Sequence, residues 1–251
     1  MGRSIDLNAD LGEGYPTDEA VLDVVSSASI ACGFHAGTPL EMLNTARSAA
    51  SRGVALGAHP SYFDREGFGR RDMDVPPDQL LAILAYQIGA MSSIAAAAGS
   101  ALTFVKPHGG LYNRAAVDPS TAESVVDAVR LAGRGSLALL CPGGSTLAQK
   151  AESEGLPFFL ESFADRAYRP DGTLLSRSEP GSVLTDPDLV AERAVRIATE
   201  GAVTACDGTV LPMKSDSICV HGDTPGAPTL ARTIRMALEQ AGVAVRSFTA
   251  S

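Results

Sequence analysis

The chain has 251 residues, a formal net charge of −9 and 45% hydrophobic residues. This length allows one large α/β domain, and the hydrophobic content is ample for a sizeable core. The acidic balance argues against nucleic acid and against an anionic membrane surface, because both require clustered lysine and arginine. We therefore expect a globular protein that binds neither.

Strand-like apolar runs alternate with segments of helical periodicity along nearly the whole chain. The expected strands cover residues 4–10, 29–33, 54–58, 102–106, 137–141, 158–163 and 217–220. The expected helices cover residues 39–52, 77–98, 120–132, 146–154, 187–200 and 228–240, and several open with Pro, Ser, Thr or Asp. Roughly seven βα units without a linker predict one parallel sheet and a single domain over residues 1–251. The pattern alone leaves open whether the sheet closes.

Location and redox state follow from what the chain contains. The first residues, MGRSIDLNAD, enter a strand-like run without the apolar core of a signal peptide. The longest apolar stretches fall short of the roughly 18 residues that span a membrane. The cysteines are scattered without a CxxC pair, which indicates neither a zinc knuckle nor a disulfide framework. We expect a cytoplasmic protein.

All four histidines stand at ends of expected strands or just beyond. His35, His59, His108 and His221 each end an apolar run, and a Gly or Pro follows within two residues. In α/β folds the active site lies at the carboxyl ends of the strands. Histidine titrates near neutrality and is also the commonest metal ligand. The pattern predicts one functional site shared by the four.

The first expected strand places polar side chains on one face. Asp6, Asn8 and Asp10 alternate with apolar residues, so they share a face of the strand. Two carboxylates this close repel unless a proton or cation lies between them. Glu13, in a turn between two glycines, could reach the same pocket. The alternative is an edge strand whose polar face meets solvent.

Cationic residues gather at the other strand ends. Lys106 precedes His108 at one terminus, where an ammonium could neutralise an oxyanion or a substrate carboxylate, or pair with Asp165 or Asp10. Arg70, in the segment GFGRR, suits a carboxylate or phosphate, although a solvated surface role is equally compatible. Two further candidates at the rim are Asp165 and Arg166. The segments 168–179 and 207–214 have the pattern of hairpin or loop insertions that could cover this rim.

No nucleotide-binding loop or covalent nucleophile is indicated. The nearest match to a phosphate loop, residues 208–215, has Met213 where the second glycine is required. A metal set of Asp10, His35 and His59 would offer mixed nitrogen and oxygen ligands for Zn²⁺, Mn²⁺ or Co²⁺. Acid–base chemistry beside Asp10 and Lys106 is the favoured interpretation, and this metal site is the alternative.

Longer motifs connect the chain to a known family. Six blocks stand in order between residue 5 and about residue 227: IDLNADLGEG, SIACGFHAGTP, GAHPSYFDREGFGRR, FVKPHGGLYN, FADRAYRPDGTLLSR and ICVHGDTPGA. They resemble the motifs of the LamB/YcsF family, the PxpA group of 5-oxoprolinase subunits. The chain departs from the family pattern in a shortened loop after Gly14 and in KPHGGLYN, where the family has KPHGALYN.

The resemblance implies a fold and an activity. The fold is a distorted seven-stranded β/α (TIM-like) barrel, similar to the glycoside hydrolase/deacetylase folds in which an Asp and two His often hold a metal. The activity is that of a cytoplasmic subunit that, with subunits PxpB and PxpC, cleaves 5-oxo-L-proline to L-glutamate, with ATP and Mg²⁺ as co-substrate. We expect catalysis from Asp10, Glu13, His59, Lys106 and His108, and substrate contacts from Asn8, His35, Arg70, Asp165, Arg166 and His221.

Two rival functions remain open from the sequence. One is an autonomous metal-dependent hydrolase or deacetylase of a small amide, and the other is a non-catalytic subunit that binds the lactam. The substrate carboxylate would bind through Lys106 or Arg70 in the catalytic interpretation. The division of labour between subunits and the formation of a homo-oligomer are also open.

Overall fold

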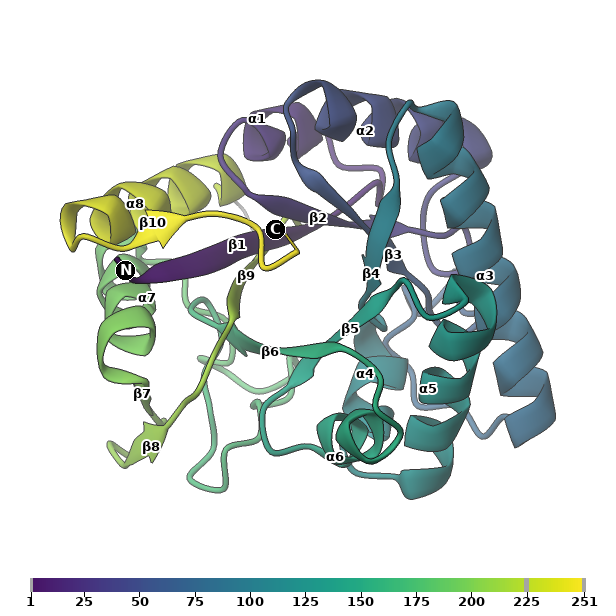
Figure 1. Cartoon of the computed structure of the whole chain (residues 1–251). Helices are drawn as coiled ribbons and strands as arrows, with labels where there is room; N and C mark the ends of the chain where they lie inside the picture. The colour runs from purple at the N-terminus through teal and green to yellow at the C-terminus, as the bar shows by residue number, and fades with distance from the viewer. Residues whose placement is uncertain (1, 224–225, 250–251) are drawn as a thin grey trace.

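The computed structural model describes residues 2–223 and 226–249, and its centre is a closed barrel of seven parallel strands (Figure 1). The strand order is β1-β2-β3-β4-β5-β6-β9, and β9 returns to pair with β1. The expected α/β sheet is therefore confirmed as a TIM-like barrel. Its strands are β1 (Ser4–Leu11), β2 (Ser27–Ala31), β3 (Ala55–His59), β4 (Leu102–Val105), β5 (Ala138–Pro142), β6 (Phe158–Phe163) and β9 (Ser217–His221).

Helices cover the outside of the barrel, as the view along its axis in Figure 1 shows. The longer ones begin where the sequence predicts, because a capping side chain or an N-terminal proline favours a helix start there. Asp118 and Asp186, for example, each accept a hydrogen bond from a backbone N–H of the first turn. The helices are α1 (Asp18–Leu22), α2 (Pro39–Ser51), α3 (Pro77–Ala97), α4 (Gly109–Ala115), α5 (Pro119–Gly133), α6 (Thr146–Ser153), α7 (Pro187–Glu200) and α8 (Ala227–Gln240).

The two shortest helices were not expected from the sequence. The helices α1 and α4 have 5 and 7 residues, too few to show a helical period. An antiparallel hairpin of β7 (Ala202–Thr204) and β8 (Val210–Pro212) lies outside the barrel, within and beside the expected insertion. β10 (Ala244–Val245) adds to β1.

The helix α3 meets the length and hydropathy criteria for a membrane span, contrary to the expectation that no stretch would. Its buried residues Leu80, Leu84, Ile88 and Met91 recur every three or four positions, so they share one face. The helix packs against α2, α5 and the β3–β4 part of the barrel. This packing is that of a barrel helix.

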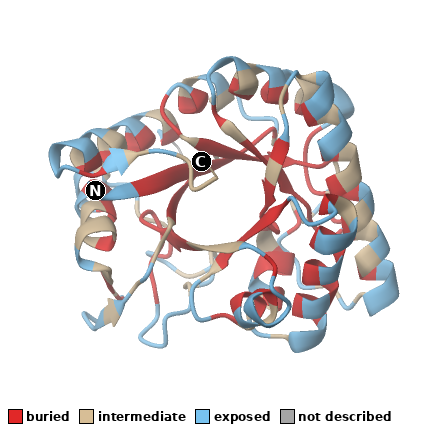
Figure 2. Cartoon of the chain, in the orientation of Figure 1, coloured by how far each residue is buried: buried red, intermediate tan, exposed pale blue. Residues whose placement is uncertain are grey.

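The two ends of the barrel interior differ in chemistry. Phe104 and Leu140 are buried inside it, and Phe159 and Phe248 pack against them. These four side chains form an apolar plug at this end of the barrel. Gly57 on β3 faces the plug, and a Cβ there would overlap the Phe104 ring, so a glycine is required. Strand residues are buried almost all round the barrel (Figure 2). Toward the carboxyl ends of the strands the interior is polar, and there the predicted residues converge.

Candidate functional site

Asp6, Asn8 and Asp10 point into the barrel from β1, and all three are buried. The edge-strand alternative is wrong, because β1 pairs with β2 on one side and β9 on the other. Asp6 lies nearest the amino end, where it accepts hydrogen bonds from the hydroxyls of Ser26, Ser27 and Ser217. Burial raises its pKa to about 6 in spite of these bonds. Asp6 therefore lies beneath the site.

Lys106 is the buried centre of the site. Its Nζ lies 2.9 Å from Asp10 Oδ1 and 2.7 Å from Glu161 Oε1, and it also donates to Asn8 Oδ1 at 3.3 Å. Burial alone would lower the pKa of Lys106, but Asp10 and the other groups around it hold it well above its ordinary value. Burial likewise opposes ionisation of Asp10, yet the neighbouring His59 and Lys106 bring its pKa well below its ordinary value. Both groups are charged at neutral pH.

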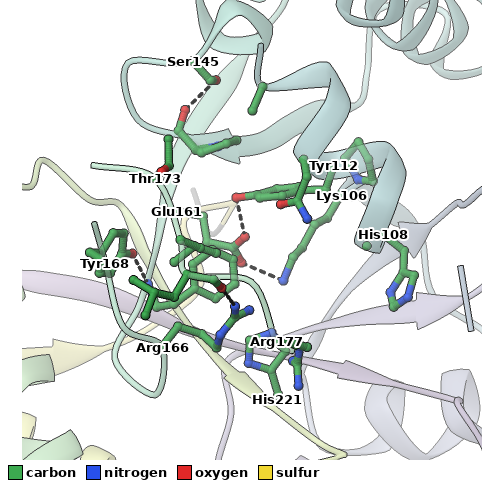
Figure 3. A pocket seen from close by; sticks show the side chains of 18 of the residues that line it. Lys106, His108, Tyr112, Ser145, Glu161, Arg166, Tyr168, Thr173, Arg177 and His221 are labelled. Carbon is green, nitrogen blue, oxygen red and sulfur yellow. Dashed lines mark hydrogen bonds and ion pairs between the residues drawn. The ribbon is translucent and has the colours of Figure 1, made fainter. Parts of the chain in front are cut away.

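Glu161 and Tyr112 were not expected from the sequence. Glu161 lies on β6 and accepts from the Tyr112 hydroxyl at 2.9 Å (Figure 3). It also accepts from Asn8 Nδ2 at 2.9 Å. The signal was present, because Glu161 is the one carboxylate within the apolar run FFLESF. The expected pairing of Lys106 with Asp10 is confirmed, whereas its pairing with Asp165 is wrong, since Asp165 bonds His221 instead.

Three histidines form one wall of the site together with Glu13. His35 Nε2 lies 3.0 Å from Glu13 Oε1, and His108 Nδ1 lies 2.9 Å from His59 Nε2. Burial, followed by the neighbouring imidazoles, lowers the pKa of His35 and of His108 well below the ordinary value. Burial, followed by Asp10 and Asp223, raises the pKa of Glu13 well above its own.

The fourth histidine lies apart from this wall. His221 Nδ1 lies 2.9 Å from Asp165 Oδ2, and its ring stacks on Phe163 with the centroids 5.4 Å apart. Burial opposes ionisation of Asp165, but His221 lowers its pKa below the ordinary value. Within the described residues, Asp165 Oδ1 is buried without a hydrogen-bond partner. His221, His59 and His108 nevertheless line the same cavity, and His35 contacts Glu13 in its wall.

That cavity has a volume of about 770 Å³. Lys106, Glu161 and His221 are among the residues that line it (Figure 3). Arg70 and Arg177 line it, and both lie beside Asp223, Arg177 at 3.6 Å. Two guanidinium groups thus share one carboxylate, which leaves positive charge at the cavity wall.

Arg166, expected to contact the substrate, instead has its guanidinium bound to backbone carbonyls. Its guanidinium donates to the backbone carbonyls of Ser182 and Leu175, so it holds the segment 167–183 against the cavity. This segment contributes Tyr168 and residues 171–177 to the cavity lining. The expected insertion therefore does cover the site.

Among residues 2–223 and 226–249, two groups of side chains bring metal-ligating atoms within 4.8 Å of one another. One is Glu13 with His35, His59 and His108, and the other is Asp10 with Cys219 and His221. The predicted trio of Asp10, His35 and His59 is divided between them, although His59 Nε2 lies only 3.3 Å from Asp10 Oδ2.

Comparison with known proteins gives full-length matches. The LamB/YcsF family model matches residues 5–251. A 5-oxoprolinase A subunit of Pseudomonas syringae pv. tomato, numbered 3 in that organism, is 51% identical, over 98% of each chain. The 5-oxoprolinase A subunit of Streptomyces griseus is 54% identical, over 97% of this chain and 99% of its own. The crystal structure of a lactam utilization protein from Thermus thermophilus has a TM-score of 0.92 and 45% identity, over 98% of this chain and 100% of that one.

More distant solved structures share the barrel alone. T48 deacetylase has a TM-score of 0.52 at 13% identity, over 97% of this chain and 87% of that one. A GH113 β-1,4-mannanase also has a TM-score of 0.52, at 11% identity, over 94% of this chain and 99% of that one. These matches confirm the predicted glycoside hydrolase/deacetylase-like fold.

Proposed function

This chain belongs to the LamB/YcsF family, and we propose on that basis that it is the A subunit of a 5-oxoprolinase. With two partner subunits, PxpB and PxpC, it would cleave 5-oxo-L-proline to L-glutamate, coupled to hydrolysis of ATP with Mg²⁺, in the cytoplasm. The observation that carries the proposal is identity above 50% along nearly the whole chain to relatives of that name. The cavity chemistry supports it independently.

The substrate presents a carboxylate and a lactam amide. We assign the carboxylate to Arg70 and Arg177, because these two cations share Asp223 as their counter-ion at the cavity wall. A carboxylate there would complete the charge balance. Lys106 is less suited to this role, since its ammonium already faces Asp10 and Glu161. Its charge instead keeps Asp10 ionised.

Opening the lactam requires water at the carbonyl carbon and a proton on the departing ring nitrogen. In the ATP-coupled route the lactam oxygen is first phosphorylated, and water then attacks the activated carbon. Asp10 is the base that we assign to this water, because it is ionised, lines the cavity and is held by Lys106 at 2.9 Å. The buried imidazoles of His59 and His108 lie beside it.

The test is glutamate formation from 5-oxoproline, measured with and without ATP, for this chain alone and with its two partner subunits. We expect ATP-dependent glutamate only in the complete mixture. Asp10→Asn should abolish it, while Asp127→Asn, an exposed carboxylate on α5, should leave it unchanged. Circular dichroism establishes that both variants are folded.

The outcomes separate the rival functions. Glutamate formation by this chain alone without ATP would favour an autonomous hydrolase. Binding of 5-oxoproline without turnover in any mixture would leave a non-catalytic lactam-binding subunit. Full activity in Asp10→Asn would remove Asp10 from the mechanism and leave the assignment as 5-oxoprolinase intact.

A further inference from the structure

The imidazoles of His59 and His108 are each bound on their outer nitrogen by a backbone carbonyl. His59 Nδ1 lies 2.8 Å from the Lys106 carbonyl, and His108 Nε2 lies 2.8 Å from the Phe68 carbonyl. A carbonyl can only accept, so each outer nitrogen must carry a hydrogen. In the neutral ring the other nitrogen is then a bare lone pair. The tautomers of both rings are fixed by the fold.

The two lone pairs open into the same small space between the rings. His59 Nε2 and His108 Nδ1 are 2.9 Å apart, and neither has a hydrogen to donate in the neutral state. Two nitrogen lone pairs at this distance repel unless a positive charge lies between them. That charge is either a shared proton or a metal cation.

The surrounding charges favour a dication. Lys106 contacts two carboxylates, Asp10 and Glu161, and a third carboxylate, Glu13, lies beside His108. When all three are ionised, the one ammonium leaves two negative charges uncompensated. Arg70 compensates another group, since it pairs with Asp223. A single proton would balance only half of this deficit.

The distances between the donor atoms suit a metal ion. Glu13 Oε1 lies 3.5 Å from His108 Nδ1, and Asp10 Oδ2 lies 3.3 Å from His59 Nε2. Ligands about 2.1 Å from a tetrahedral metal are about 3.4 Å from one another. The rings of His59 and His108 are inclined at 87°, so their lone pairs can converge on one point.

His35 belongs to the support of this site and is not a ligand. Its ring stacks on His108 with the centroids 3.8 Å apart and an angle of 3°, so the two lone pairs lie in parallel planes and cannot meet at one ion. Ser61 Oγ lies 3.0 Å from His35 Nδ1. On the other side of the ring, His35 Nε2 lies 3.0 Å from Glu13 Oε1, and this contact orients the carboxylate.

We propose that His59 Nε2, His108 Nδ1 and the Glu13 carboxylate bind a divalent first-row transition-metal ion such as Zn²⁺, with Asp10 beside it and His35 positioning Glu13. Two imidazoles and a carboxylate form the donor set of such ions, whereas Mg²⁺ and Ca²⁺ prefer oxygen alone. The carbonyls of Lys106 and Phe68 are the outer acceptors that metal-bound histidines commonly have.

The loop over His108 is shaped for this contact. Phe68 has a φ of +53°, a left-handed conformation that is uncommon for a residue with a side chain, and its carbonyl is the one that fixes His108. A Cβ on the next residue, Gly69, would lie 2.8 Å from both His108 Cδ2 and His35 Cβ. The backbone cost of this loop is consistent with a need to hold one imidazole tautomer.

The ion would be reachable from the cavity, because its three ligands all line it. A metal ion in such a position lowers the pKa of a bound water or polarises a carbonyl oxygen. The binding site is independent of the proposed 5-oxoprolinase activity and is tested without it.

The experiment is isothermal titration of the chelator-treated, dialysed full chain with Zn²⁺, with Co²⁺ as a spectroscopic probe and Mg²⁺ as control. We expect one saturable Zn²⁺ site, visible Co²⁺ absorption of low-coordinate geometry and no comparable Mg²⁺ binding. Replacing a residue that hydrogen-bonds to a metal ligand typically weakens the metal affinity by about 10–100-fold. His59→Ala and His108→Ala, which remove a ligand, should therefore weaken Zn²⁺ by more than about 100-fold. The His221→Ala variant should bind Zn²⁺ with the same affinity as the unaltered protein.

A second measurement covers variants that fail to fold. In the unaltered chain with ¹⁵N-labelled histidine, Zn²⁺ should shift the signals of His59 Nε2 and His108 Nδ1 and leave the His221 signals in place. The proposal is overturned if no saturable Zn²⁺ or Co²⁺ binding occurs and the spectra show a proton shared by His59 and His108. It is equally overturned if only His221→Ala abolishes binding, since the ion would then lie at Asp10 and Cys219.

Discussion

Replacing Lys106 with methionine removes a buried ammonium and keeps most of the side-chain volume. Its Nζ contacts Asp10 at 2.9 Å and Glu161 at 2.7 Å, and both carboxylates are buried. Breaking a buried ion pair from one side costs about 3–5 kcal/mol, because the remaining charge is left uncompensated. For a chain of this size each kcal/mol lowers Tm by roughly 2–4 °C, so we expect a loss of about 6–20 °C.

The pH dependence of the Lys106→Met defect has a defined sign. In the unaltered protein the folded pKa of Asp10 is depressed, so its contribution to stability is present above its unfolded pKa and is lost as the pH falls through the folded pKa. Without the ammonium, burial raises the pKa of the carboxylates, and the variant is destabilised as the pH rises from about 4 to 7. The stability gap between the two proteins should therefore be widest at pH 7.

The assay is urea unfolding at pH 5 and pH 7 in the presence of a chelator, for Lys106→Met, Glu161→Gln and the double variant. The double variant removes one charge of each sign. Its loss of unfolding free energy should therefore be smaller, by about 1–3 kcal/mol, than the sum of the losses in the two single variants. Additive losses, or a stability gap that does not widen with pH, would refute the description of Lys106 as the counter-ion of these two carboxylates.

Three further predictions concern other parts of the molecule. The pKa of Asp6 is raised to about 6, so the folded state binds more protons than the unfolded state above pH 4. Stability should fall by about 2 kcal/mol as the pH rises from 4 to 7, and Asp6→Asn should flatten this part of the urea-unfolding profile. Gly57→Ala should destabilise the protein by about 1–3 kcal/mol in urea unfolding, since its Cβ would overlap the Phe104 ring. Gly89→Ala on α3, which has open space around it, should stabilise the protein by about 0.5–1 kcal/mol. Equal effects of the two changes would contradict the apolar plug in the barrel. Arg177→Ala should raise KM for 5-oxoproline at least about 10-fold in steady-state kinetics, because one charge-assisted contact to the substrate carboxylate is lost, and an unchanged KM would place that carboxylate elsewhere.

The order of strands and helices, and the rim on which the site lies, could be predicted from the sequence. Buried parallel strands are apolar on both faces and their helices carry a 3.6-residue period, so each unit is visible from local pattern alone. That Asp6, Asn8 and Asp10 share one face follows from the two-residue period of β1 in the same way, whereas only the pairing of β1 on both sides shows that this face points inward. The full-length family resemblance was equally a property of the sequence.

Which of these groups meet depends on the closure of the barrel. Asn8 and Glu161 bond across 153 positions of the chain, and the pairing of β6 with β9 and of β9 with β1 sets that contact. No local pattern specifies such a partner, so Lys106 was paired correctly with Asp10 but wrongly with Asp165. The adjacent lone pairs of His59 and His108 depend likewise on two carbonyls from separate loops, because a tautomer is fixed by its hydrogen-bond partners and not by the residue type.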